Sequence, residues 1–179
     1  AVVSHAEEYG TYTMQRAKDA DGKDLSYFLF YYLDEDGRIK AYMPEITMAE
    51  SGFNYTDFYA VETVGGLNAT KIEYLIATLG ILYYDYKVPL KDTTVERNNQ
   101  LKLYGLTEDE RETIEITYLD SEGKEQKHKI IIGDKLTGGA GYYFMIDDRE
   151  CIYAASSSTS LSYALSGFKS IIHSRIVAA

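Results

Sequence analysis

The chain has 179 residues, of which 45% are hydrophobic and 26% are charged, so it can bury a core and is not expected to be disordered. Its formal net charge is −10 and its densest basic stretch is short, residues 124–129, which argues against the dense positive surface that nucleic acids and anionic lipids need. The single cysteine, Cys151, cannot form an internal disulfide, and no apolar run approaches the roughly 18 residues of a membrane span.

The first part of the chain predicts strands joined by acidic turns. Loose alternation over residues 8–17 predicts a strand, and residues 19–22 (Asp-Ala-Asp-Gly) are typical of a turn. Residues 25–33 form an apolar and aromatic run that is short for a helix and favours a strand. After a second acidic turn at residues 34–37 (Asp-Glu-Asp-Gly), residues 38–43 return as the partner strand of a hairpin.

The clearest helix signal follows in the middle of the chain. Residues 45–56 are polar and indicate a loop, and residues 58–64 predict another strand. Asn68 or Thr70 can cap the helix, with Glu73 three residues beyond Thr70 as in a capping box. Apolar side chains at three- and four-residue spacing then form one stripe, which consists of Ile72, Leu75, Ile76, Leu79 and Leu82 or Tyr83.

A second hairpin is predicted further along the chain. Pro89 should close the helix, and residues 90–111 are mixed and polar with no clear element. Residues 113–119 alternate cleanly, residues 120–123 (Asp-Ser-Glu-Gly) indicate a turn, and residues 126–132 return. This pattern predicts an antiparallel pair with one solvated face.

The last elements are a strand pair and a helix. Residues 142–146 and 151–155 read as two strands across a short acidic turn. Ser156, Ser157 and Ser158 are candidate caps for a helix over residues 161–168 or as far as residue 172.

Together these elements predict an α+β fold with a mainly antiparallel sheet and two principal helices packed on one face. A hairpin, a strand and a helix follow one another over residues 25–83, and a hairpin, a strand pair and a helix over residues 113–168. This order suggests a duplicated ββ(β)βα unit. We expect residues 1–179 to form a single domain, with two similar halves at about 8–88 and 100–176.

No metal site is indicated. His5, His128 and His173 lie far apart, and none has a second ligand at a typical spacing. The acidic residues 34–37 resemble the start of a calcium loop, but Ile39 stands at the sixth position, where the sharp turn needs glycine. We interpret this segment as a hairpin turn.

Catalytic motifs are not indicated either. Residues 156–160 are serines and a threonine without an accompanying motif, and Cys151 has only Arg149 as a positive neighbour in sequence. The Gly-rich residues 133–141 do not end in Gly-Lys-Ser/Thr, and Asp147-Asp148 lies in a turn. We therefore expect no catalytic residues and no cofactor, and interpret the chain as a binding module, not an enzyme.

The second half resembles a known family. The segments that carry the resemblance are residues 103–106 (Leu-Tyr-Gly-Leu), 130–134 (Ile-Ile-Ile-Gly-Asp), 141–144 (Gly-Tyr-Tyr-Phe) and 152–156 (Ile-Tyr-Ala-Ala-Ser). Over residues 55–176, the chain is similar to the domain-of-unknown-function 4340 family. We expect Gly105 and Gly133 to need positive φ at turns, and Tyr142, Tyr143 and Tyr153 to pack on the sheet.

This resemblance implies a setting and no catalytic residues. It implies an extracytoplasmic bacterial protein that is tethered to the membrane through an N-terminal segment and associated with an ABC-type transport system, including those linked to gliding motility. The start at Ala1 agrees with a mature or excised form. The implied partner is a protein of a membrane transport complex, with no membrane insertion by this segment.

Two alternative functions are predicted from these features. The first is a non-catalytic accessory module, which predicts an exposed apolar or aromatic patch. The second is a small-ligand or glycan-binding domain, which predicts a pocket lined by several tyrosines. The chain has 18 Tyr against 6 Phe and no Trp, which agrees with sheet packing or with a recognition surface.

Overall fold

The computed structural model describes most of the chain. The described residues are 2–6, 10–44, 52–54, 56–64, 69–139, 141–147, 149–156 and 159–166. The strands are β1 (Val2–Ala6), β2 (Gly10–Lys18), β3 (Asp24–Leu33), β4 (Ile39–Pro44), β5 (Ala60–Val64), β6 (Tyr86–Pro89), β7 (Glu112–Leu119), β8 (Glu125–Lys135), β9 (Tyr142–Ile146) and β10 (Cys151–Ala155). The helices are α1 (Ala69–Leu79), α2 (Thr94–Leu103) and α3 (Thr159–Ser166).

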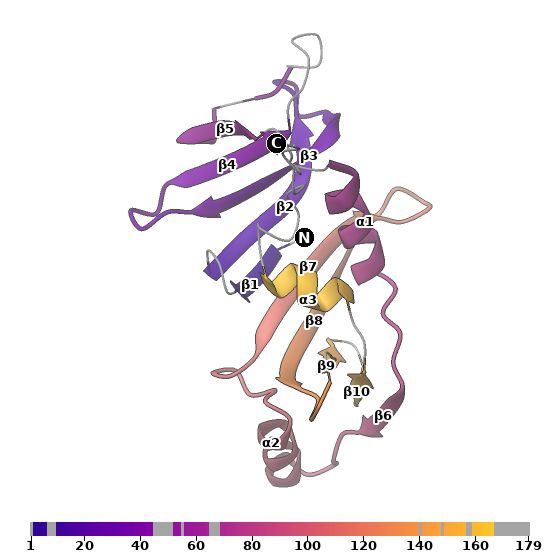
Figure 1. The fold of residues 1–179 in the computed structure, drawn as a ribbon. Coiled ribbons are helices and arrows are strands. Elements are labelled where there is room, and N and C mark those ends of the chain that lie inside the picture. The colour runs from indigo at the N-terminus through magenta and orange to yellow at the C-terminus, as the bar shows by residue number, and fades with distance from the viewer. Residues whose placement is uncertain are drawn as a thin grey trace, which may run out of the picture.

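All ten strands belong to one sheet, in the order β5-β4-β3-β2-β1-β7-β8-β9-β10-β6. Every neighbouring pair is antiparallel except β4 and β5, which are parallel. The long sheet runs through the molecule, and α1 and α3 lie together against its middle (Figure 1). The predicted α+β fold with a mainly antiparallel sheet and two principal helices on one face is confirmed.

Three hairpins turn on the same local chemistry. In each turn, an aspartate Oδ1 accepts the backbone N–H groups two and four residues further on, at 2.9–3.0 Å. A glycine with positive φ stands at the fourth position, where other residues would be strained. The three turns span residues 19–22, 34–37 and 120–123.

The main core lies between the sheet and the two helices. Alternate residues of β2, β3, β7, β8 and β9 point to this side, as the two-residue period of a strand requires. Tyr12 stacks on Phe30 with ring centroids 4.6 Å apart, and the Tyr12 hydroxyl donates a hydrogen bond to the carbonyl oxygen of Ala164 in α3. The apolar stripe of α1 packs here through Ile72, Leu75 and Leu79.

The opposite face of the first strands carries a smaller cluster. It contains Ala17, Tyr27, Leu29, Met43 and Phe53. Residues 27–30 of β3 are therefore buried on both faces of the sheet. This double burial explains why that strand reads as a continuous apolar run in the sequence and not as an alternating one.

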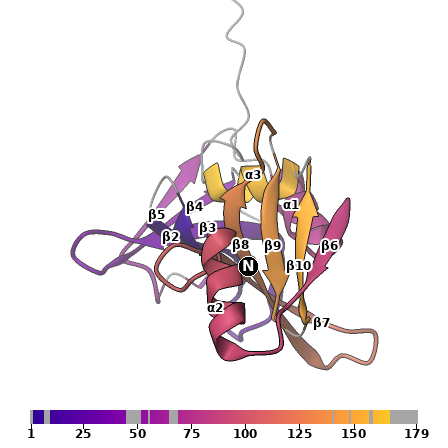
Figure 2. The ribbon, with the colours of Figure 1, turned by 90° about the horizontal axis from the view of Figure 1, so that it is seen from below.

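The helical elements differ from expectation in two respects. The helix α2 was not predicted; Thr93 caps it by accepting a hydrogen bond from the backbone N–H of Glu96. The helix α1 ends at Leu79, earlier than the stripe through Leu82 or Tyr83 indicates, and Pro89 ends the edge strand β6 and not the helix. The helix α2 lies away from α1 and α3 at the lower end of the molecule in Figure 1, which is the end nearest the viewer in Figure 2.

Two glycines have different physical roles. Gly105 adopts φ +66°, as predicted. The prediction for Gly133 was wrong, because Gly133 lies in β8 without a positive φ. A Cβ at Gly133 would overlap the carbonyl oxygen of Tyr104, which accepts the backbone N–H of Asp134 at 2.9 Å. Close backbone approach is therefore what requires glycine at this position.

Some predicted features lie outside the described residues. These are most of the loop at residues 45–56, the cap at Asn68, the serines 157 and 158, and any extension of the last helix beyond residue 166. Within the described part of the chain, no helix is long and apolar enough to cross a membrane.

Candidate functional site

A groove opens on the core face of the sheet at the end of α1. It has a volume of about 460 Å³, and we call it the α1 groove. One wall comes from α1 and the residues that follow it, which are Ile76, Ala77, Leu79, Gly80 and Leu82. The floor comes from three strands and consists of Ile116, Ile130 and Ile146.

The early end of α1 produces this groove. The backbone N–H of Gly80 bonds to the carbonyl oxygen of Ala77, so the chain leaves the helix there and runs towards β6. The strands β7 and β8 continue past this point, where Ile116 lies opposite His128 in the ladder. The ends of these strands therefore extend beyond the end of α1, and the hollow lies between the hairpin and that end.

The rim of the α1 groove is polar. The Tyr118 hydroxyl and His128 Nε2 lie 3.0 Å apart in a hydrogen bond, and their rings are stacked at 5.7 Å. Arg149, an exposed residue, lines the groove near Ile146, whose carbonyl oxygen accepts the Arg149 backbone N–H at 2.9 Å. Among the residues that the structure describes, no Asp or Glu lines the groove, although the chain has ten more acidic than basic residues.

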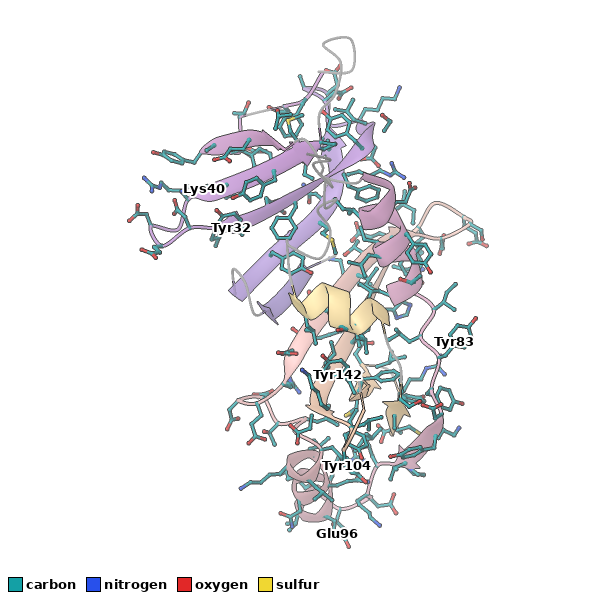
Figure 3. All side chains as sticks on the ribbon, in the orientation of Figure 1. Tyr32, Lys40, Tyr83, Glu96, Tyr104 and Tyr142 are labelled. Atoms are coloured by element: carbon teal, nitrogen blue, oxygen red, sulfur yellow. The ribbon has the colours of Figure 1, made fainter. Side chains whose placement is uncertain are left out.

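Exposed apolar side chains flank the groove on both sides. On the α1 side, Ile81 is 66% exposed and Tyr83 is 85% exposed, and Tyr83 points away from the body of the molecule (Figure 3). On the hairpin side, Tyr118 and Leu119 are also exposed. Large apolar side chains in this number around one hollow indicate a contact surface.

The segment between α1 and β6, which contains Tyr83 and Tyr84, is anchored to the core. Tyr84 packs on Tyr153 with ring centroids 4.9 Å apart, and Tyr153 stacks on Phe144 at 5.3 Å. The carboxylate of Asp85 accepts the backbone N–H of Ser156 at 2.5 Å, and this bond lowers the pKa of Asp85. The exposed residues before β6 therefore sit on a fixed backbone.

A second group of tyrosines lies on the opposite face of the sheet. The Tyr86 and Tyr143 hydroxyls are 3.5 Å apart, and the Tyr104 and Tyr143 rings meet edge-on at 4.7 Å. The hydrogen bond with Tyr86, followed by burial, raises the pKa of Tyr143 to about 12. These rings pack on one another, whereas Tyr142 and Tyr153 are buried in the core.

Of the described residues that were weighed from the sequence as sites, only His128 lines the groove. His5 lies in β1, and His173 is outside the described residues. Cys151 is half-buried beside the core, and the acidic residues 34–37 form a turn in which Arg38 pairs with Asp34 at 2.9 Å. Among the residues described, no three His, Cys, Asp or Glu side chains are grouped as metal ligands.

Sequence reasoning missed the other groove residues. The signal for Ile76 and Leu82 was present as a helical stripe, but it predicted a longer helix and hence a covered surface. Ile146 and Arg149 flank a turn, and the local sequence of a turn does not indicate which distant residues it lies beside.

No protein-family model, no curated protein and no solved structure matches this chain. The chain is therefore assigned to no family, and the resemblance of its second half stays an expectation. What the domain does has to be argued from the α1 groove and its surroundings.

Proposed function

We propose that this domain is a non-catalytic accessory module that binds a partner through the surface around the α1 groove. One observation carries the proposal: exposed apolar side chains gather on both sides of an apolar hollow and are held on an ordered backbone. Aromatic and apolar side chains in such an arrangement are the usual anchors of protein interfaces.

The chemistry of the groove supports binding over catalysis. Of the described residues, no Ser, Thr or Cys lines it, so the described lining offers no common nucleophile apart from the rim residues. Its ionisable pair, Tyr118 and His128, is hydrogen-bonded within itself. The remaining lining is mainly aliphatic, which suits burial of apolar groups.

The proposed partner is a protein of a membrane transport complex, and the proposed location is outside the cytoplasm, with membrane attachment through a segment that precedes this chain. The support for this setting is the resemblance in residues 103–156 described above. The acidic surface, with a net charge of −10, favours a protein partner over nucleic acid.

Site-specific photo-crosslinking in the native cell tests this proposal. A photoreactive residue at position 83 should crosslink to a subunit of a membrane transport complex, identified by mass spectrometry, because Tyr83 is 85% exposed beside the groove. The matched control is position 59, since Tyr59 is 62% exposed but lies beside Arg38 in the first half of the sheet. Ile81→Asp should abolish the crosslink from position 83.

The proposal is contradicted if position 83 captures no such subunit or if positions 59 and 83 give the same products. A uniform product pattern would mean that crosslinking reports general exposure and not a specific surface. Thermal unfolding of Ile81→Asp should match that of the parent chain, because Ile81 is already 66% exposed.

The α1 groove also supports the second candidate, a small-ligand-binding domain. Its volume of about 460 Å³ lies within the range of small-molecule sites, roughly 300–1,000 Å³. The lining differs from the one predicted, since its described residues include a single tyrosine, Tyr118, and are mostly aliphatic. It therefore favours an apolar ligand over a glycan.

A further inference from the structure

A second pocket lies in the first half of the sheet, on the face that carries the smaller cluster. It has a volume of about 520 Å³ and lies between strands β2–β4 and the residues that lead into β5; we call it the β3 pocket. Its described lining shares no residue with that of the α1 groove. We propose that the β3 pocket binds a neutral carbohydrate, which is a site and a ligand class beyond the functions proposed above.

The floor of the β3 pocket comes from neighbouring strands. Leu29 belongs to the smaller cluster, and Tyr31 lies two residues further along β3 and therefore on the same face. Gln15 of β2 lies opposite Leu29 in the ladder, and its side-chain Oε1 accepts a hydrogen bond from the Tyr31 hydroxyl at 3.3 Å. An aromatic ring and a planar amide therefore stand side by side on this floor.

The wall of the pocket is held against the strands at two points. The backbone N–H of Asn54 donates to the carbonyl oxygen of Lys18 at 2.9 Å, and that of Tyr59 donates to the carbonyl oxygen of Ile39 at 2.8 Å. Between these points, the Phe58 ring meets the Tyr31 ring edge-on, with centroids 5.7 Å apart. The wall therefore brings a second aromatic ring to the floor from a segment distant in the sequence.

The aromatic rings fit the apolar face of a sugar. Tyr31 and Phe58 are half-buried, so each keeps exposed surface, while Phe53 packs 5.5 Å from Phe58 and is buried. The C–H groups on one face of a pyranose ring are weakly positive, and the face of an aromatic ring is negative. Packing of the two removes apolar surface from water on both sides.

The polar side chains beside the rings fit the hydroxyl groups of a sugar. A hydroxyl both donates and accepts hydrogen bonds, so its site needs groups of both kinds. Asn54 Oδ1 accepts from the backbone N–H and the hydroxyl of Thr56. Within the described part of the chain, the amide nitrogens of Gln15 and Asn54 and the carboxylate of Asp57 make no hydrogen bond. The pocket therefore offers two donor groups and one acceptor group to a ligand.

The charge of the pocket disfavours an anionic sugar. Its described lining contains three aspartates, Asp19, Asp21 and Asp57. The one cation of this lining, Lys18, is paired with Asp24 at 2.6 Å. The sequence of residues 45–59, which leads into β5, contains no lysine or arginine. A carboxylate on the ligand would therefore be repelled, whereas a neutral sugar would not.

NMR titration of the isotope-labelled chain tests the proposal. The neutral probes are cellotetraose, maltotetraose and chitotetraose, and the anionic probe is tetragalacturonate. At least one neutral tetrasaccharide should bind saturably and shift the signals of Tyr31 and Phe58. Tetragalacturonate should bind at least about tenfold more weakly than that sugar, because its carboxylates meet the aspartates.

Two variants with matched controls locate the site. Phe58→Leu keeps an apolar side chain but removes the ring, and should weaken sugar binding roughly three- to tenfold. Asp57→Ala removes the acceptor and should weaken it about tenfold, without a change in thermal stability because Asp57 is exposed. The controls are Tyr59→Leu, whose ring lies on Arg38 and outside the described lining, and Asp92→Ala, an exposed aspartate after β6. Both should leave the affinity unchanged.

Several outcomes would overturn the inference. These are no binding of any neutral tetrasaccharide, equal binding of tetragalacturonate, or equal losses in the variants and their controls. Binding of tetramethylammonium in the absence of any sugar binding would mean that the pocket takes organic cations, and would overturn it too.

Failure of this inference is distinguishable from failure of the accessory-module proposal. Ile81→Asp, which should abolish the crosslink from position 83, should leave sugar binding unchanged, because Ile81 lies beside the α1 groove in the other half of the sheet. Conversely, that crosslink should persist in Asp57→Ala.

Discussion

The two halves of the sheet hold together by different means. In β2–β4, aromatic and aliphatic side chains are buried on both faces, and the glycines Gly22 and Gly37 stand in open turns where an added Cβ would meet nothing. In β7–β10, close backbone contacts matter more: a Cβ at Gly133 or Gly141 would overlap the carbonyl oxygen of Tyr104 or Ala155.

The same kind of hairpin turn therefore occurs in two halves of the sheet that pack in different ways. In the first half, the turn glycines have open space around them and are required by their positive φ alone. Backbone packing in the second half brings Tyr104 and Leu106 directly against β8, where no side chain can be added. The two halves meet at the β1–β7 pair and share one core cluster.

The largest expected effect is at Gly133. The variant Gly133→Ala should lower the free energy of unfolding by about 3 kcal/mol. The reason is that the added Cβ would overlap the carbonyl oxygen of Tyr104 and would also lie 2.9 Å from the Leu106 side chain. Gly139→Ala is the control, since its Cβ would have ordinary contacts at 3.8 Å. Urea unfolding measures both, and equal stability of the two variants would refute the backbone-packing interpretation of the second half.

A smaller effect should follow from Tyr12→Phe. This change removes the hydroxyl that bonds to Ala164 and leaves a buried carbonyl oxygen in α3 without that donor, which should cost about 1–2 kcal/mol. Burial raises the pKa of Tyr12 well above its usual value, which agrees with a hydroxyl that stays protonated. Tyr31→Phe, which removes an exposed bond to Gln15, should cost much less, and equal losses would show that the bond to α3 does not couple the two halves.

The smallest effect concerns pH and the turns that the two halves share. The pKa of Asp34 is lowered mainly by the backbone N–H of Arg38, and that of Asp120 mainly by the Gln126 side chain and then the backbone N–H of Lys124. Because the folded pKa lies below the unfolded one, each contribution is full above about pH 4 and is lost as the pH falls through the folded value.

Carbon-detected NMR titration of the two carboxyl groups checks this expectation. Both midpoints should lie below 3.8, the ordinary value for aspartate. Added salt should raise the midpoint of Asp34 more, because the Arg38 charge contributes there and no cation is among the causes for Asp120. Midpoints at or above 3.8 would contradict the proposed hydrogen bonding of these turns.

Much of the fold was predictable because its signals are local. The three acidic turns were identified from an aspartate followed by glycine three residues later, and the structure shows the hydrogen bonds that this spacing permits. The helix α2 was missed because it is mostly polar and buries only Gln100, although Thr93 and Glu96 gave a usable capping signal. The strand β1 was missed because its five residues have no turn signal of their own.

By itself, the sequence determined the hairpins, the apolar face of α1 and the acidic turns, since each depends on neighbours within a few residues. Only the tertiary structure decided that β1 pairs with β7 and β6 with β10. It also decided that Ile76 and Ile146 line one groove, because α1 stops short of the hairpin. These outcomes depend on contacts between segments far apart in the chain, which no local pattern encodes.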